Sequence, residues 1–203
     1  MHDQKPLHAN GPEWRVSLSQ PAPEHEAEFL SAVERSEALH RPWAFAPATP
    51  EAYAEYLERI RNGRTIGFLI RFRADQSPVG VVNISEPVMG IFRSAYLGFY
   101  AFAGRQGRGL MTEGLALVLD TAFGELGFHR LEANIQPQNA ASRALVRRLG
   151  FRQEGFSPRY LLIDGAWRDH ERWAMLSEEW PEPRRRLFAS PGANGRQSPD
   201  AES

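Results

Sequence analysis

The chain has 203 residues, a formal net charge of −1, 42% hydrophobic residues and no cysteine. This length suits one globular domain and is enough to bury a sizeable core. The lack of cysteine excludes disulfides, thiolate metal sites and a cysteine nucleophile. The near-zero net charge argues against direct nucleic-acid binding and gives no general attraction to membranes.

The two ends of the chain differ in composition from its middle. Residues 1–13 are polar and lack the apolar run of a secretory signal, so we interpret them as a flexible arm. Residues 181–203 are rich in Pro, Arg and Ser and are predicted to be disordered. One domain is therefore expected over residues 14–180. Because no stretch approaches the roughly 18 apolar residues of a membrane span, we expect a cytoplasmic protein without a membrane partner.

The first part of this domain predicts a strand and two helices. Alternation over residues 14–18 predicts a strand, and apolar residues at near-helical spacing predict a helix over residues 23–39. Thr49 is a suitable N-cap, Pro50 fits a first helical turn, and Asn62-Gly63 is a typical stop. A second helix is expected between these signals.

Three strands and a glycine-rich loop come next. Residues 65–72 and 79–84 are predicted strands joined by turn-forming residues, and the aromatic-rich segment 94–102 is a third. The loop Gly104-Arg-Gln-Gly-Arg-Gly109 follows directly. Beyond it, apolar residues at spacings of three and four from Met111 to Leu126 predict a helix with one buried face.

The strand–helix order then repeats. A short strand is predicted over residues 130–135, followed by a helix that Asn139 opens and Gly150 closes as a C-cap. Asp164-Gly165 between two apolar segments is a strong hairpin signal. The resulting order, β-α-α-β-β-β-α-β-α-β-β, predicts an α+β fold around a mixed sheet.

The glycine-rich loop is the first candidate for a binding site. The segment Gln106-Gly-Arg-Gly-Leu-Met111 lies between a strand and a helix, where backbone N–H groups point outward and favour anions. Glycine lets the backbone approach a phosphate closely, and Arg108 adds positive charge. Taken alone, the loop is equally well read as a plain tight turn. It is not a Walker loop, since no Gly-Lys-Ser/Thr follows, and its glycine spacing does not fit a dinucleotide-binding fingerprint.

In its context, the loop resembles the acetyl-CoA motif of the GNAT superfamily of N-acetyltransferases, Gln/Arg-x-x-Gly-x-Gly/Ala. Gln106 and Gly109 occupy its first and fourth positions, whereas Met111 replaces the small sixth residue. A second motif of the family follows downstream, with Asn139-x-x-Ser142 ahead of Leu149-Gly-Phe151.

The C-terminal part of the domain narrows this resemblance. The run Tyr160-Leu-Leu-Ile-Asp-Gly-Ala-Trp-Arg-Asp-His170 is similar to the RimJ/RimL branch, which acetylates N-terminal alanine or serine residues of ribosomal proteins. The resemblance implies the GNAT fold, in which helices flank a mixed, mostly antiparallel central sheet.

The resemblance also implies acetyl-CoA as co-substrate. No metal site is expected, because the histidines are scattered without ligand spacing. The third predicted strand is expected to offer backbone N–H groups to the thioester. The residues implied to bind acetyl-CoA lie on this strand, in the loop and at the starts of the next two helices: Tyr100, Phe102, Gln106, Gly107, Arg108, Gly109, Leu110, Met111, Thr112, Asn139 and Ser142.

Two residues are candidates for proton transfer. An α-amino group has a pKa near 7.7–8.0, against about 10.4 for lysine, so a carboxylate acting directly or through water suffices as the base. The resemblance assigns this role to Glu86. It assigns Ser142 as the partner of the leaving thiolate, since Val146 stands where many relatives have a tyrosine. The alternatives are an exposed strand-end carboxylate for Glu86 and backbone capping for Ser142; Asn139 reads equally as an N-cap.

The sequence specifies the acceptor amine less closely than it specifies the acetyl donor. The first hypothesis is the N-terminal alanine or serine of a ribosomal protein. A second hypothesis keeps the reaction and replaces the acceptor by a small-molecule amine or an antibiotic. A third is a non-catalytic CoA-binding module. The sequence is compatible with a monomer and with a homodimer.

Overall fold

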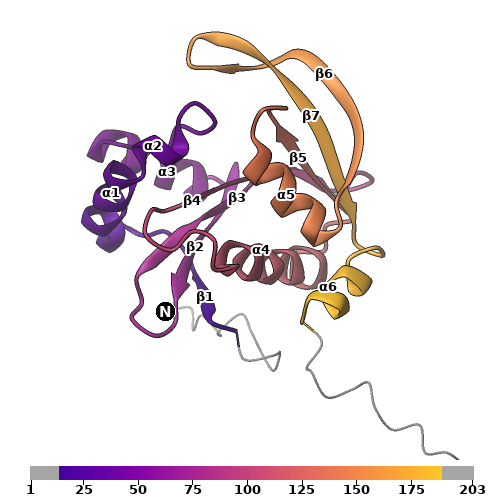
Figure 1. Ribbon diagram of the computed structural model, residues 1–203, viewed down its shortest axis with the longest axis horizontal. Coiled ribbons are helices and arrows are strands. Elements are labelled where there is room, and N and C mark those ends of the chain that lie inside the picture. The colour runs from indigo at the N-terminus through magenta and orange to yellow at the C-terminus, as the bar shows by residue number, and fades with distance from the viewer. Residues whose placement is uncertain (1–13, 189–203) are drawn as a thin grey trace, which may run out of the picture.

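The computed structural model describes residues 14–188, and within them seven strands form one sheet in the order β1-β2-β3-β4-β5-β7-β6 (Figure 1). Neighbouring strands are antiparallel except β4 and β5, which are parallel. This confirms the predicted α+β class with a mixed, mostly antiparallel sheet. The strands are β1 (Val16–Ser19), β2 (Thr65–Phe72), β3 (Pro78–Val88), β4 (Ser94–Ala101), β5 (Arg130–Ile135), β6 (Arg152–Ile163) and β7 (Ala166–Leu176).

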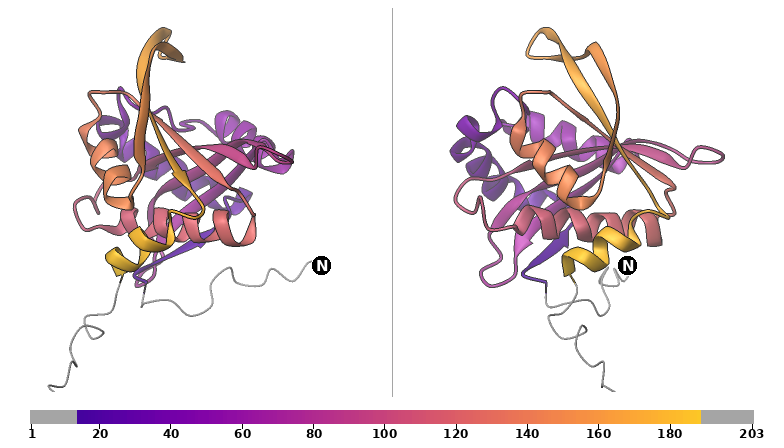
Figure 2. Two further views of the ribbon diagram at one scale, coloured as in Figure 1. Left: turned by 90° about the vertical axis from the view of Figure 1, so that its right-hand side faces the viewer. Right: turned by 45° about the vertical axis from the view of Figure 1, so that its right-hand side comes forward.

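Helices cover both faces of the sheet (Figures 1 and 2). On one face, Phe29 and Tyr53 pack with Val81 in one apolar cluster. On the other face, Leu115 packs with Leu97 in a larger cluster. The helices are α1 (Glu26–Arg35), α2 (Glu37–His40), α3 (Pro50–Arg61), α4 (Leu110–Asp120), α5 (Ala140–Leu149) and α6 (Pro181–Phe188), with a 3-10 turn at Pro23–His25 and a π-helical turn at Thr121–Glu125.

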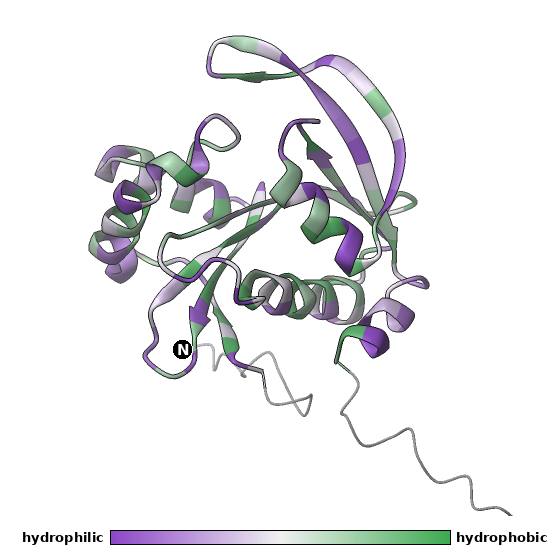
Figure 3. Cartoon of the chain, in the orientation of Figure 1, coloured by the Kyte–Doolittle hydropathy of each residue, from purple (hydrophilic) through white to green (hydrophobic). Residues whose placement is uncertain are grey.

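Helix α4 is the most deeply buried helix of the described range. Nine of its eleven residues are buried, and Figure 3 shows it as largely hydrophobic. Since it contacts β1, β2 and β3 on one side and α5 on another, apolar residues are favoured over most of its circumference. The start of α4 is therefore fixed firmly relative to the sheet.

Strands β4 and β5 separate soon after they meet. Their parallel pairing covers only three residue pairs, from Ser94 with Arg130 to Tyr96 with Glu132. Beyond Tyr96, β4 continues to Ala101 paired only with β3, while β5 stays paired with β7. The sheet thus has a split between the two strands, which leaves one edge of β4 unpaired.

Most predicted elements are confirmed, including the cap residues. Thr49 accepts a hydrogen bond from the N–H of Ala52 at the start of α3, and Gly150 closes α5 with φ of 91°. The prediction of one continuous helix over residues 23–39 was wrong, because the observed helix is interrupted at Ser36. The buried Ser36 hydroxyl donates to the Ala32 carbonyl (2.6 Å) and accepts from the N–H of Ala103 (2.8 Å).

The predicted disorder from residue 181 onward was wrong for residues 181–188, which form α6. Asp120 on α4 anchors this helix by accepting from Trp180 Nε1 (2.8 Å) and Arg184 Nε (2.7 Å). The ring of Phe188 lies edge-on to Trp14, with ring centroids 4.5 Å apart. Composition did not reveal this helix because its partners lie far away in sequence. Residues 1–13 and 189–203 lie outside the described range.

Strands β6 and β7 form a long hairpin that extends beyond the rest of the sheet (Figure 1). Its turn is Asp164-Gly165, as predicted. Arg41, directly after α2, lies 3.7 Å from the Asp164 carboxylate. The hairpin tip thus contacts the segment that follows α2.

Candidate active site

A cleft of about 430 Å³ lies at the unpaired end of β4. This volume is within the range of small-molecule sites. The end of β4, the glycine-rich loop, the first turn of α4, the start of α5 and the segment after α2 form its walls. Of the eleven residues that the sequence implied for acetyl-CoA binding, ten line it: Tyr100, Phe102, Gln106, Gly107, Gly109, Leu110, Met111, Thr112, Asn139 and Ser142.

The first turn of α4 presents uncapped backbone donors to this cleft. Gly109 occupies the N-cap position with φ of 77°, and no side chain accepts a hydrogen bond from the turn. The N–H groups of Leu110, Met111 and Thr112 have no partner within the helix, because the first residues of any helix lack one. Together with the helix dipole, these donors favour an anionic group such as a phosphate.

An ion pair between the half-exposed Arg15 and the largely buried Glu113 holds the loop against α4. Arg15 donates from its Nε to Glu113 Oε1 (2.7 Å), and its backbone N–H donates to Glu113 Oε2 (3.0 Å). The same arginine donates from Nη2 to the Arg108 carbonyl (2.9 Å). The structure thus gives Arg108 a backbone role, and its side chain is not among the residues that line the cleft.

The positive charge at the cleft comes instead from Arg105 and Arg148. Arg105 pairs with Asp75 and lies over the ring of Phe72. Arg148 on α5 points toward α4, where its Nη1 lies 3.5 Å from Thr112 Oγ1. Sequence reasoning missed both arginines. The available signal for Arg148 was its position seven residues, about two turns, after Ala141, which also lines the cleft and so lies on the same side of α5.

The backbone of β4 corrects one expectation about the thioester. The N–H of Phe102 donates to the Val79 carbonyl on β3 (2.7 Å), so it is not free for a ligand. Since N–H groups alternate in direction along a strand, Tyr100 also points toward β3, whereas Phe99 and Ala101 point into the split. The Ala101 carbonyl also points away from β3, because it accepts a hydrogen bond from His40 Nε2 (2.8 Å).

His40 is a further residue that sequence reasoning missed. It is buried, it lines the cleft, and its ring lies 5.0 Å from that of Tyr100. Because the Ala101 carbonyl only accepts hydrogen bonds, Nε2 carries the proton and Nδ1 has a free lone pair. Burial lowers the pKa of His40, and the hydrogen bond to Ala101 opposes this shift. His40 is therefore neutral at pH 7.

Asn139 and Ser142 lie together at the start of α5. The Asn139 side chain accepts from the N–H of Ser142 (3.1 Å) and so acts as the predicted N-cap. Both residues also line the cleft. Val146, at the position where the family resemblance implies a tyrosine in many enzymes, is fully buried. Capping therefore uses the Ser142 amide and leaves its hydroxyl for another partner.

The structure does not bring Glu86 to the cleft. Glu86 lies at an irregularity in the β3–β4 pairing, with φ of 50°, and its N–H donates to the Arg64 carbonyl (3.0 Å). Its carboxylate is 60% exposed and lies 3.4 Å from Arg64 Nη2. Its catalytic role stays a prediction.

Residues 14–188 contain neither a metal-binding cluster nor a membrane-spanning helix. Within residues 14–188, no group of three or more His, Asp or Glu side chains is arranged to hold a metal ion. No helix among these residues has both the length and the apolarity required to cross a membrane.

Comparison with known proteins identifies the family. Residues 15–152, well over half of the chain, match the acetyltransferase (GNAT) domain. The chain is 42% identical over 102 residues to [ribosomal protein uS5]-alanine N-acetyltransferase of Escherichia coli, a match that covers 50% of this chain and 53% of that relative. It therefore spans about half the length of that curated relative.

Two further similarities bear on the fold and on the acceptor. The solved structure of Mycobacterium smegmatis RimJ in complex with CoA-disulfide has a TM-score of 0.77 and 30% identity, covering 89% of this chain and 97% of that one. Spermidine N(1)-acetyltransferase of Escherichia coli is 23% identical over 164 residues, covering 79% of this chain and 86% of that relative.

Proposed function

This chain belongs to the GNAT acetyltransferase family, and we propose that it transfers the acetyl group of acetyl-CoA directly to the N-terminal alanine or serine of a ribosomal protein. The observation that carries the proposal is the cleft at the β4–β5 split, where uncapped N–H groups of α4 and an unpaired strand edge meet. The uncapped N–H groups favour a pyrophosphate, and the unpaired strand edge favours an extended arm that contains amides. Coenzyme A contains both, as its pyrophosphate and its pantetheine arm.

The α4 end of the cleft is proposed to bind the phosphates. The backbone N–H groups of Leu110, Met111 and Thr112 are uncharged hydrogen-bond donors. Arg148 and Arg105 supply positive charge. Because the phosphates make contacts with fixed backbone groups, little of their binding energy is lost in ordering side chains.

The strand end of the cleft is proposed to hold the thioester. A backbone N–H of Phe99 or Ala101 that points into the split can donate to the thioester oxygen as negative charge develops on it. The Ser142 hydroxyl, across the cleft on α5, is the proposed partner of the departing thiolate. A thiol with a pKa near 8.5 is a fair leaving group, so one hydrogen bond is a sufficient aid.

The acceptor assignment is supported by the similarity to the uS5-alanine acetyltransferase and to RimJ. A second candidate is a small polyamine, which the similarity to spermidine acetyltransferase favours. A protein N-terminus needs less help to lose its proton than an alkyl amine does, because its pKa is lower by about 2.5 units.

The direct test is thiol release from acetyl-CoA with a panel of acceptors. Peptides that begin with Ala or Ser are expected to release coenzyme A, and matched peptides with a blocked N-terminus are not. Turnover with spermidine but with no peptide would transfer the assignment to the second candidate. Binding of acetyl-CoA by calorimetry, without release for any amine, would indicate a non-catalytic module and refute the proposal.

A further inference from the structure

The face of the sheet opposite α4 carries a polar strip beside the split. Successive residues of a strand point to opposite faces. On β5, Leu131 and Ala133 are buried in the cluster under α4, so Glu132 and Asn134 point to the other face. On β4, Tyr96 points to this same face, because its neighbour Leu97 packs under α4.

Glu132 occupies the point where the two strands part. It is paired with Tyr96 in the last residue pair before the split opens. Gly98, two residues further along β4 on this face, has open space where a Cβ would lie. Glu132 is not among the residues that line the cleft; it lies at the vertex of the split on the face opposite α4, beside the unpaired edge of β4 that an acceptor entering from this face would reach.

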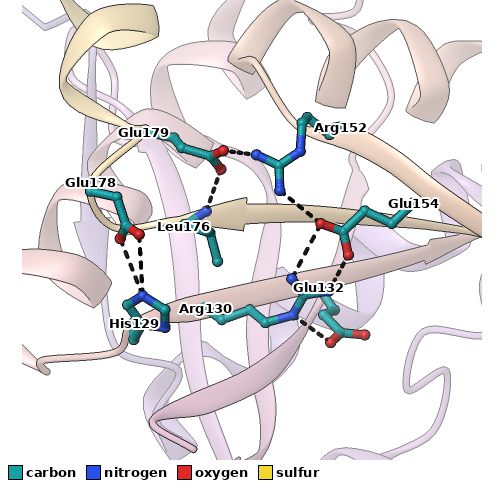
Figure 4. Close-up of polar contacts among 8 residues, drawn as sticks. All are labelled: His129, Arg130, Glu132, Arg152, Glu154, Leu176, Glu178 and Glu179. Carbon is teal, nitrogen blue, oxygen red and sulfur yellow. Dashed lines mark hydrogen bonds and ion pairs between the residues drawn. The ribbon is translucent and has the colours of Figure 1, made fainter.

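The Glu132 carboxylate is held in place and remains accessible. Arg130 Nε donates to it (2.7 Å), and the same guanidinium bonds Glu154 (2.5 Å), which also accepts from Arg152 (2.8 Å; Figure 4). The Glu132 side chain is 25% exposed. A carboxylate fixed in this way can receive a substrate group without being reorganised first.

Two side chains on β4 and β5 carry buried polar atoms without a hydrogen-bond partner. Among the described residues, the buried Asn134 Oδ1 on β5 and Tyr100 Oη on β4 have no hydrogen-bond partner. Leaving such an atom buried and unpaired costs about 1–3 kcal/mol. An acceptor molecule that carries N–H groups would supply the missing partner to Asn134.

We propose that Glu132 is the catalytic carboxylate that receives the acceptor ammonium group and takes its proton. This inference rests on the proposed function. The ammonium loses a proton to Glu132, directly or through one water, and the neutral amine attacks the thioester carbon. The carbon–sulfur bond breaks and acetyl stays on nitrogen, which gives up its second proton; this proton balances the one that the thiolate gains as coenzyme A, and Glu132 returns the first proton to solvent.

The surroundings of Glu132 contain other groups that titrate or carry charge. A hydrogen bond with Tyr160 raises the pKa of Tyr96, with burial as the next cause. Tyr96 is therefore neutral at pH 7 and is not a competing base. The groups around Glu132 are Arg130 on its own strand, Tyr96 on β4, Glu154 and Tyr160 on β6, and Arg172 on β7.

The test compares Glu132→Gln and Glu132→Asp with the parent, using the best acceptor from the peptide panel. Glu132→Gln is expected to lower kcat/KM about 100-fold at pH 7, within the range for a general base, and to move the pH–rate profile upward. Its acetyl-CoA affinity should stay within about twofold of the parent, because it lies on the other face from α4. Glu132→Asp, which keeps a carboxylate, should keep the parent's profile shape at a reduced rate.

The matched control is Glu55→Gln on the exposed side of α3, which is expected to behave as the parent. A parent-like rate and profile for Glu132→Gln overturns the inference, as does a loss confined to Glu86→Gln. A fall in Tm of more than about 5 °C, or weakened acetyl-CoA binding by Glu132→Gln, would also overturn it, by showing a structural role. An inactive parent would instead refute the proposed function itself.

Discussion

The thioether of Met111 lies against Gly80, since a Cβ added to Gly80 would lie 2.5 Å from Met111 Sδ. Gly80 is on β3 and Met111 is in the first turn of α4. Met111 stands where the acetyl-CoA motif has a small residue. The glycine on the neighbouring strand makes room for the larger side chain, so the first turn of α4 keeps its place at the cleft.

Gly80→Ala is therefore expected to weaken acetyl-CoA binding and to lower stability by about 1–3 kcal/mol, as overpacking commonly does. The added methyl group would meet Met111 and also the Tyr100 carbonyl at 2.5 Å. Because the second contact is backbone, Gly80→Ala/Met111→Ala should recover only part of the loss. Denaturant unfolding and calorimetry measure the two effects. Full recovery in the double variant would show that the backbone contact is unimportant.

Arg15→Gln should raise the KM for acetyl-CoA about tenfold with little change in kcat. The reason is that Arg15 links Glu113 in α4 to the Arg108 carbonyl in the loop, and a tenfold change corresponds to about 1.4 kcal/mol, comparable to one charge-assisted hydrogen bond. The matched control is Arg73→Gln, since Arg73 donates to the Val16 carbonyl and not to the loop. Equal KM values for the two variants would contradict this role.

Ser142→Ala should lower turnover far more than acetyl-CoA affinity. The Asn139 cap uses the backbone N–H of Ser142, so the substitution leaves the cap intact and removes only the hydroxyl. Asn139→Ala serves as the comparison, with an expected loss of about 1 kcal/mol in stability. An unchanged rate for Ser142→Ala in a thiol-release assay would remove the serine from the mechanism.

Acidification should destabilise the protein partly through His40. Burial lowers the pKa of His40 in the folded state, so below its unfolded value of about 6.5 the unfolded chain binds a proton that the folded chain does not. Stability is thus fully present above about pH 6.5 and is lost as the pH falls below it. The same direction holds for His170, where burial is again the main cause.

His40→Gln should reduce this loss, because glutamine keeps an N–H donor for the Ala101 carbonyl and does not titrate. The Tm of parent and variant measured between pH 7.5 and about pH 5 checks the expectation. A fall in Tm as steep as the parent's would assign the acid sensitivity to His170 and the carboxylates instead.

Local sequence signals determined most of the secondary structure of this protein. Thr49 and Asn139 are N-caps and Gly150 is a C-cap, as their residue types predict. Asp164-Gly165 forms the turn of the β6–β7 hairpin. These features depend on neighbours within a few residues, so they can be predicted from the sequence without knowledge of the fold. The glycine-rich loop, read with the family resemblance, likewise located one wall of the cleft.

Only the tertiary structure decided which groups meet at the site. His40 and Arg148 reach the cleft from helices far apart in sequence, and helix α6 is ordered by Asp120, about 60 residues before it. The position of Glu132 at the β4–β5 split depends on which strand lies beside β4 and on where their pairing ends. Long-range pairing of this kind leaves no local signal, because the free energy that favours it comes from burial between distant segments.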